Sequence, residues 1–208
     1  MGPQTIMDSW LAELSDDLHH RRGDDLLRSL TESDTLGRVV RIDNRELVNI
    51  AGNDYLALAR HPHLIDAVTR AAHDHGVGAG ASRLITGTTP LHVQVEQRFA
   101  AFKHAQAAII CPTGYMANLA AVTAVAQPGD CICADKLNHA SLIDAARASG
   151  ATVRVYPHKQ HDKLARLLAR HRDARRRLII TDSVFSMDGD CADLPRLCDL
   201  ADEHDAVL

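Results

Sequence analysis

The chain has 208 residues, of which 46% are hydrophobic and 24% are charged, and its formal net charge is −4. This composition is typical of a globular protein with enough apolar side chains for one good core. The small negative charge gives no support to nucleic-acid binding or to attraction by an anionic membrane, so we expect neither partner.

The N-terminal residues lack the basic start, apolar core and cleavage site of a secretory signal, and no apolar run approaches the ~20 residues of a membrane helix. We therefore expect a cytoplasmic protein. The five cysteines lack the paired spacing of a disulfide framework. Cys131 and Cys133 alternate along an expected buried strand, where cysteine acts as a small hydrophobe. The thirteen histidines lack a metal-ligand pattern, and we expect no metal site.

The first fifty residues predict a helix followed by a small hairpin. Apolar residues at four-residue spacing predict an amphipathic helix from Met7 to about Leu30. Its apolar side chains are Trp10, Leu11, Leu14 and Leu18. Residues 38–42 and 46–50 flank the turn-forming pair Asp43-Asn44, which predicts the hairpin. Residues 1–50 are therefore treated as one segment and residues 51–208 as the large domain.

Two helices and a glycine-rich loop are expected next. Pro62 favours the first turn of a helix that runs to about His75. The stretch from Gly76 to Thr89 is rich in glycine and small polar residues, which predicts a loop with unusual backbone conformations. An apolar pattern after Pro90 predicts a further helix.

From Ala105 onward, short apolar strands alternate with helices. This order predicts an α/β fold with a mostly parallel, doubly wound sheet and helices on both faces. The expected strands cover residues 107–111, 131–134, 152–156 and 178–181. The expected helices cover residues 114–126, 139–149, 162–170 and 193–204. Residues 206–208 read as the opening of another strand, so we expect a chain that is cut inside a sheet.

Three segments at the carboxyl ends of expected strands carry candidate chemistry. At Gly114 a helix begins after a turn, and its free N–H groups attract phosphate, although a plain strand-to-helix turn is the alternative. His139 can cap the helix that follows it, or its ring can stack on a planar cofactor and exchange protons. Ser186 is either a turn residue or a hydroxyl donor to a cofactor. No P-loop or dinucleotide fingerprint is present, which disfavours a nicotinamide-binding protein.

The order and separation of five motifs resemble the α-oxoamine synthase family of pyridoxal-phosphate (PLP) enzymes. These motifs are Asn53-Asp54-Tyr55-Leu56, Gly80 to Thr88, Thr113-Gly114-Tyr115, Leu137 to Leu142, and Val184 to Gly189. The resemblance runs from about residue 18 to the end and implies the large domain of PLP fold type I, incomplete at its C-terminal end. The chain departs from the family pattern at Ala57, where the family usually has glycine.

The resemblance also implies a role for each site residue. Backbone at Gly114 and Tyr115 would hold the cofactor phosphate, and Ser186 would bond the cofactor. His139 would stack on the pyridine ring, contact substrate and assist proton transfer at the substrate α-carbon. Asn53 would line the substrate pocket. Arg28, on the first helix, would bind the substrate carboxylate, which suits the guanidinium fork, and a surface arginine is the alternative.

The reaction implied is the decarboxylative condensation of L-alanine with a pimeloyl thioester of CoA or a carrier protein, which serves biotin synthesis, in a homodimer. Family branches that use glycine or serine share most of the pattern. The four lysines, at positions 103, 136, 159 and 163, match no family position for the lysine that holds PLP. We therefore expect the chain alone to be inactive. A fragment is favoured over a non-catalytic partner subunit.

Overall fold

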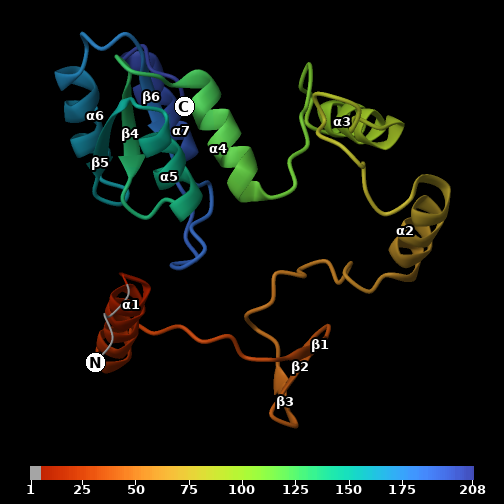
Figure 1. The fold of residues 1–208 in the computed structure, drawn as a ribbon. Helices are drawn as coiled ribbons and strands as arrows, with labels where there is room; N and C mark the ends of the chain where they lie inside the picture. The colour runs from red at the N-terminus through yellow and green to blue at the C-terminus, as the bar shows by residue number, and fades with distance from the viewer. Residues whose placement is uncertain (1–5) are drawn as a thin grey trace. The chain divides into compact units, whose positions relative to one another are not determined.

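The computed structural model describes residues 6–208 of the chain (Figure 1). It contains two compact units, one that ends at Gly80 and one from Ala81 to Leu208. The domain boundary expected after residue 50 stays a prediction. Within residues 6–208, no helix has both the length and the apolar character needed to cross a membrane.

The first helix, α1 (Ile6–Gly23), is shorter than the sequence predicted. The prediction that it continues to about Leu30 is wrong, because the chain turns directly after Gly23. Asp25 has a φ of 54°, in the left-handed region, and so cannot continue a right-handed helix. The apolar side chains of α1 are largely exposed, with Trp10 at 62% and Leu18 at 54%.

The predicted hairpin is confirmed and carries one further strand. The strands β1 (Asp34–Leu36), β2 (Val39–Ile42) and β3 (Arg45–Val48) form an antiparallel sheet in the order β1-β2-β3. The turn residues Asp43 and Asn44 both have positive φ, of 49° and 60°. Two residues in this conformation form the type I′ turn that matches the twist of a hairpin.

Two helices begin at the prolines identified in the sequence. α2 (Pro62–His75) ends where Gly76 takes a φ of 76°. α3 (Pro90–Phe102) starts with a reciprocal cap between Thr89 and His92. Both predicted helices are confirmed. Proline is favoured at the first turn of a helix, as in both, and glycine is favoured directly after the last turn, as in α2.

The second unit holds a parallel sheet. Its strands β4 (Cys131–Asp135), β5 (Thr152–Tyr156) and β6 (Arg177–Ile180) lie in the order β5-β4-β6, and both pairings are parallel. Val207 makes a parallel bridge to Leu178 on the other side of β6. The predicted parallel sheet is therefore confirmed, including the extended backbone near Val207.

Helices cover both faces of this sheet (Figure 1). α4 (Gly114–Val125) and α5 (Ala140–Ala148) pack on the face to which Ile132 and Ala134 point. α6 (His161–Arg170) and α7 (Leu194–Glu203) pack on the opposite face, with Cys131 and Cys133. β4 is buried along its whole length because alternate side chains enter two different cores.

The strand expected at residues 107–111 is not formed, and that prediction is wrong. The polar groups of Ile110 are instead bound by side chains. Its N–H donates to Glu96 Oε1 at 2.9 Å, and its carbonyl accepts from Arg83 Nη1 at 3.2 Å. Since a strand is defined by a backbone ladder, an apolar run that finds no partner strand among residues 6–208 does not form one.

Candidate active site

The loops that follow β4 and β6 are tied together at the carboxyl edge of the sheet. Asn138, only 5% exposed, donates from Nδ2 to the carbonyl of Ile180 at 2.8 Å and accepts the Asp182 N–H at 3.3 Å. The backbone N–H of His139 donates to Asp182 Oδ2 at 2.7 Å. These bonds fix the two loops relative to each other, although neither Asn138 nor Asp182 was singled out from the sequence.

A cavity of about 160 Å³ lies between these loops. It brings together His139, from the β4 loop, and Ser186, from the β6 loop. Its lining residues are Leu137, His139, Asp182, Val184, Phe185, Ser186, Met187 and Asp188. Met187 is 93% exposed, whereas Phe185 is 2% exposed and anchors the loop in the core. The cavity therefore combines an imidazole, a hydroxyl and two carboxylates with apolar side chains.

His139 caps the helix that follows it, α5, which was one of the two roles expected for this residue. Its Nδ1 accepts the backbone N–H of Ser141 at 3.2 Å and lies 2.7 Å from Ser141 Oγ. Ser141 Oγ in turn accepts from Asn118 Nδ2, on α4, at 2.8 Å. Capping does not exclude a role in the cavity, because nothing within residues 6–208 bonds Nε2 of the same ring.

The start of α4 presents free backbone donors. Thr113 caps the helix by accepting the Met116 N–H at its hydroxyl (3.1 Å) and the Ala117 N–H at its carbonyl (3.0 Å). In the described part of the chain, no group accepts from the N–H of Gly114 or Tyr115. A Cβ added at Gly114 would meet no atom within 4 Å, so the space beside this residue is open. Two free amides at a helix N-terminus are suited to an anion.

Gly114 and Tyr115 do not line the cavity that holds His139, but α4 and α5 pack against each other. Tyr115 donates its hydroxyl to Asp144 Oδ2, on α5, at 2.9 Å. This hydrogen bond raises the pKa of Tyr115, because the phenol is stabilised as a donor to a carboxylate. The contact positions the start of α4 relative to the helix that His139 caps.

Arg28 and Asn53 lie in the unit that ends at Gly80. The expectation that Arg28 sits on the first helix is wrong, since α1 ends at Gly23. Both side chains are exposed, and Asn53 Oδ1 accepts the Tyr55 hydroxyl at 3.4 Å. Their substrate contacts stay predictions.

Sequence reasoning missed a histidine that joins the cavity loop to the sheet. His158 follows β5, with Nδ1 2.9 Å from Asp135 Oδ1 and Nε2 3.1 Å from Asp190 Oδ2. Its ring also meets Phe185 edge to face, with centroids 4.4 Å apart. A usable signal existed, because His158, like His139, directly follows a strand at the carboxyl edge of the sheet.

The charges around His158 reinforce this connection. Burial disfavours the imidazolium, but its hydrogen bonds to the carboxylates of Asp135 and Asp190 outweigh this effect and raise the pKa of His158. The pKa of Asp190 is lowered, first by its hydrogen bond from Lys159 and then by that from His158. His158 therefore joins Asp190 on the loop to Asp135 at the end of β4.

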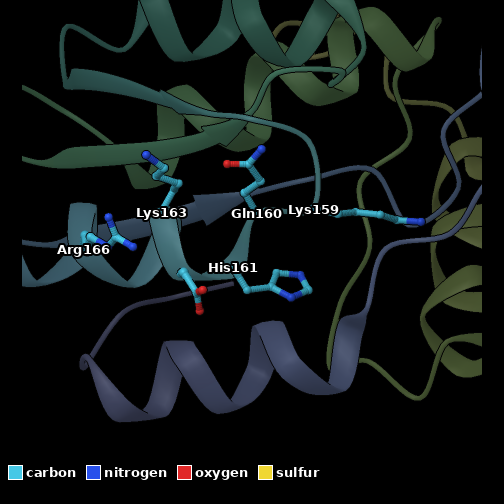
Figure 2. A pocket seen from close by; sticks show the side chains of 6 residues that line it. Lys159, Gln160, His161, Lys163 and Arg166 are labelled. Carbon is cyan, nitrogen blue, oxygen red and sulfur yellow. The ribbon is translucent and has the colours of Figure 1, made fainter.

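None of the four lysines lines the cavity. Lys159 Nζ pairs with Asp190, and Lys103 Nζ lies 5.9 Å from the centre of the Phe102 ring. Lys159 and Lys163 also border a separate polar hollow of about 400 Å³ at the start of α6, where their side chains run in different directions (Figure 2). That hollow is also lined by Gln160, His161, Asp162 and Arg166.

Comparisons with known proteins agree on one family. A family model described as aminotransferase class I and II matches residues 45–208. The chain is 48% identical over 200 residues to 8-amino-7-oxononanoate synthase of Nitrosomonas europaea, covering 95% of this chain and 51% of that protein. It is 43% identical over 195 residues to the enzyme of that name from Trichlorobacter lovleyi, covering 94% and 50%.

The fold also matches a solved structure. Serine palmitoyltransferase of S. paucimobilis, solved with a bound PLP–myriocin aldimine, superposes with a TM-score of 0.84 at 26% identity. The match covers 96% of this chain and 51% of that one. The chain thus spans about half the length of the relatives it matches.

Proposed function

The chain belongs to the aminotransferase class I and II family, and we propose that it supplies the PLP-binding part of an 8-amino-7-oxononanoate synthase. The predicted fold class, the large domain of PLP fold type I, is confirmed. The identities of 43% and 48% to proteins of this name support the biotin branch over relatives that act on glycine or serine, such as glycine C-acetyltransferase, 5-aminolevulinate synthase and serine palmitoyltransferase.

The observation that carries the proposal is the meeting of His139 and Ser186 in one cavity at the carboxyl edge of the sheet. The residues present fit pyridoxal 5′-phosphate. The free amides of Gly114 and Tyr115 would bind its phosphate, the His139 ring would stack on its pyridine ring, and Ser186 would hydrogen-bond it. The cavity of about 160 Å³ is smaller than the ~300–1,000 Å³ of most ligand sites, so we propose that it forms one wall of the complete site.

When bound, the cofactor supplies an electron sink for carbanion chemistry at the α-carbon of an amino acid. The chain's own groups orient the reactants. Asp182 fixes the backbone of His139, whose ring lines the cavity, and Nε2 of that ring would hold a proton there. Arg28 would bind the L-alanine carboxylate and Asn53 would line its pocket. The acyl donor would be a pimeloyl thioester of CoA or of a carrier protein.

We propose that these 208 residues alone do not catalyse the reaction, because none of their lysines reaches the cavity. We also propose that the complete protein acts in the cytoplasm as a homodimer. The supporting observations are the likeness to biosynthetic enzymes and the small size of the cavity within one chain.

Release of the thiol from pimeloyl-CoA tests two proposals together: the assignment to the biotin branch and the inactivity of the chain alone. The chain is assayed alone and after co-expression with the C-terminal half of the Nitrosomonas europaea relative, with alanine, glycine or serine as the amino acid. We expect no release from the chain alone and alanine-dependent release from the pair. Turnover by the chain alone contradicts its inactivity. Release with glycine or serine in place of alanine assigns another branch.

A further inference from the structure

The hydrogen bonds around His139 determine which of its ring nitrogens carries the proton. The Ser141 backbone N–H donates to His139 Nδ1 at 3.2 Å. A backbone N–H can only donate, so Nδ1 must present its lone pair, and the proton of the neutral ring lies on Nε2. We propose that Ser141 and Asn118 are positioning residues that hold His139 in this Nε2–H tautomer.

The two side chains complete a directed chain of hydrogen bonds. Since Nδ1 is an acceptor, the Ser141 hydroxyl donates to it across 2.7 Å. Its oxygen then accepts from Asn118 Nδ2 at 2.8 Å, and the amide of Asn118 is a donor at that atom. Ser141 is fully buried, so water does not compete for its hydroxyl. The direction of every proton in the chain follows from the one backbone donor.

The helix packing sets this geometry. Asn118 lies on α4 and Ser141 on α5, and the two helices share one core cluster. The backbone of His139 is held separately, through its N–H to Asp182 Oδ2 at 2.7 Å. The ring is therefore held from α4 through Ser141, and the backbone that carries it is held from the β6 loop. A second-layer partner of this kind fixes the tautomer of a functional histidine.

The consequence is chemical. A neutral ring in this state donates a hydrogen bond from Nε2 to whatever occupies the cavity, and it does not accept one there. The identity of that acceptor rests on the proposed function, but the tautomer does not, because all groups that set it belong to this chain.

Nitrogen-15 NMR of the imidazole rings measures the tautomer directly. The spectra are recorded on the chain without cofactor in alkaline buffer, where an ordinary imidazole is neutral. The His139 signals are those lost in His139→Gln. We expect a bare, acceptor-type Nδ1 and a protonated Nε2. A His139 ring that carries its proton on Nδ1 overturns the proposal.

Variants test the two positioning residues. Ser141→Ala removes the shorter bond to Nδ1 and raises the fraction of rings protonated at Nδ1 about fivefold, the factor expected for one neutral hydrogen bond. Ser141→Thr keeps a hydroxyl and restores the wild-type signals. In Asn118→Asp, the new carboxylate accepts a hydrogen bond from the Ser141 hydroxyl. The hydroxyl then turns away from Nδ1, and this loss also favours the Nδ1–H form. Ser149→Ala, at the other end of α5, is the matched control and leaves the ring unchanged.

Unaltered His139 signals in both Ser141→Ala and Asn118→Asp overturn the role of these residues. The wild-type spectrum tests the tautomer even where a variant fails to fold. A separate titration with PLP distinguishes the two proposals: a chain with the Nε2–H ring that binds no PLP refutes the proposed function and leaves this inference standing.

Discussion

At the scale of single residues, backbone conformation explains one departure from the family pattern. Ala57 stands where α-oxoamine synthases usually have glycine, and its φ is 52°. This left-handed conformation strains any residue with a Cβ, whereas glycine adopts it freely. Asp54 holds the same turn together, since its Oδ1 accepts the Leu58 N–H at 2.8 Å.

Ala57→Gly is expected to stabilise this turn by about 0.5–1 kcal/mol, the relief of strain less the greater flexibility of unfolded glycine. Amide hydrogen exchange of Leu58 should slow by about two- to fivefold. Ala59→Gly, at a position without positive φ, is the control and should not slow exchange. Equal or faster exchange in Ala57→Gly would show that the strain is absent.

Gly87 is required for a different reason. Its φ is not left-handed, but an added Cβ would lie 2.0 Å from the carbonyl oxygen of Ala81, which no backbone tolerates. We expect Gly87→Ala to lower the free energy of unfolding by about 2 kcal/mol or more, because the loop must open. A urea titration measures the loss. Gly78→Ala, where a Cβ meets no atom within 4 Å, should change stability by less than about 0.5 kcal/mol.

At the scale of elements, the sequence correctly predicted the helices and strands whose formation depends on neighbouring residues. The helices that begin at Pro62 and Pro90 and the strands around Cys131 and Thr152 were found because their caps, turns and apolar spacing lie in adjacent residues. The run at residues 107–111 was predicted wrongly, since a strand depends on a partner from elsewhere in the chain. His158 was missed because its partners, Asp135 and Asp190, are brought to it only by the parallel sheet.

The loop that carries Ser186 is expected to respond to pH through His158. The pKa of His158 is raised in the folded protein. Its contribution to the stability of the loop is therefore complete below the unfolded pKa of ~6.5 and is lost as pH rises through the folded pKa. The lowered pKa of Asp190 gives the opposite sign: its contribution is present above ~3.8 and is lost as pH falls. The loop should therefore be held most firmly between about pH 4 and 6.5.

Hydrogen exchange of the Phe185 and Gly189 amides, corrected for intrinsic rate, measures this response. Both amides bond within the loop, to the carbonyls of Asp190 and Phe185. Protection should decline above pH 6.5 in the wild type, and His158→Gln should abolish that decline. His73→Gln, on the exposed surface of α2, is the control. An unchanged profile in His158→Gln would show that His158 does not hold the loop.

At the scale of the whole molecule, the α/β class and the parallel sheet followed from alternating strands and helices. The convergence of His139 and Ser186 was also accessible, because both follow strands whose carboxyl ends share one edge. The supporting shell of Asn138, Asp182 and Asn118 was not accessible. These three residues act through contacts between loops and helices that are far apart in the sequence. No spacing along the chain predicts such contacts.

The proposed function requires that the start of α4, His139 and Ser186 form a single site for a phosphorylated pyridine. Equilibrium titration with pyridoxine 5′-phosphate tests it, because this ligand lacks the aldehyde and cannot react with surface lysines. Wild-type chain should bind it saturably, and His139→Ala and Ser186→Ala should each weaken binding about five- to tenfold, while Ser149→Ala binds as the wild type does. Absence of saturable binding, or equal affinity in all four proteins, would contradict the claim.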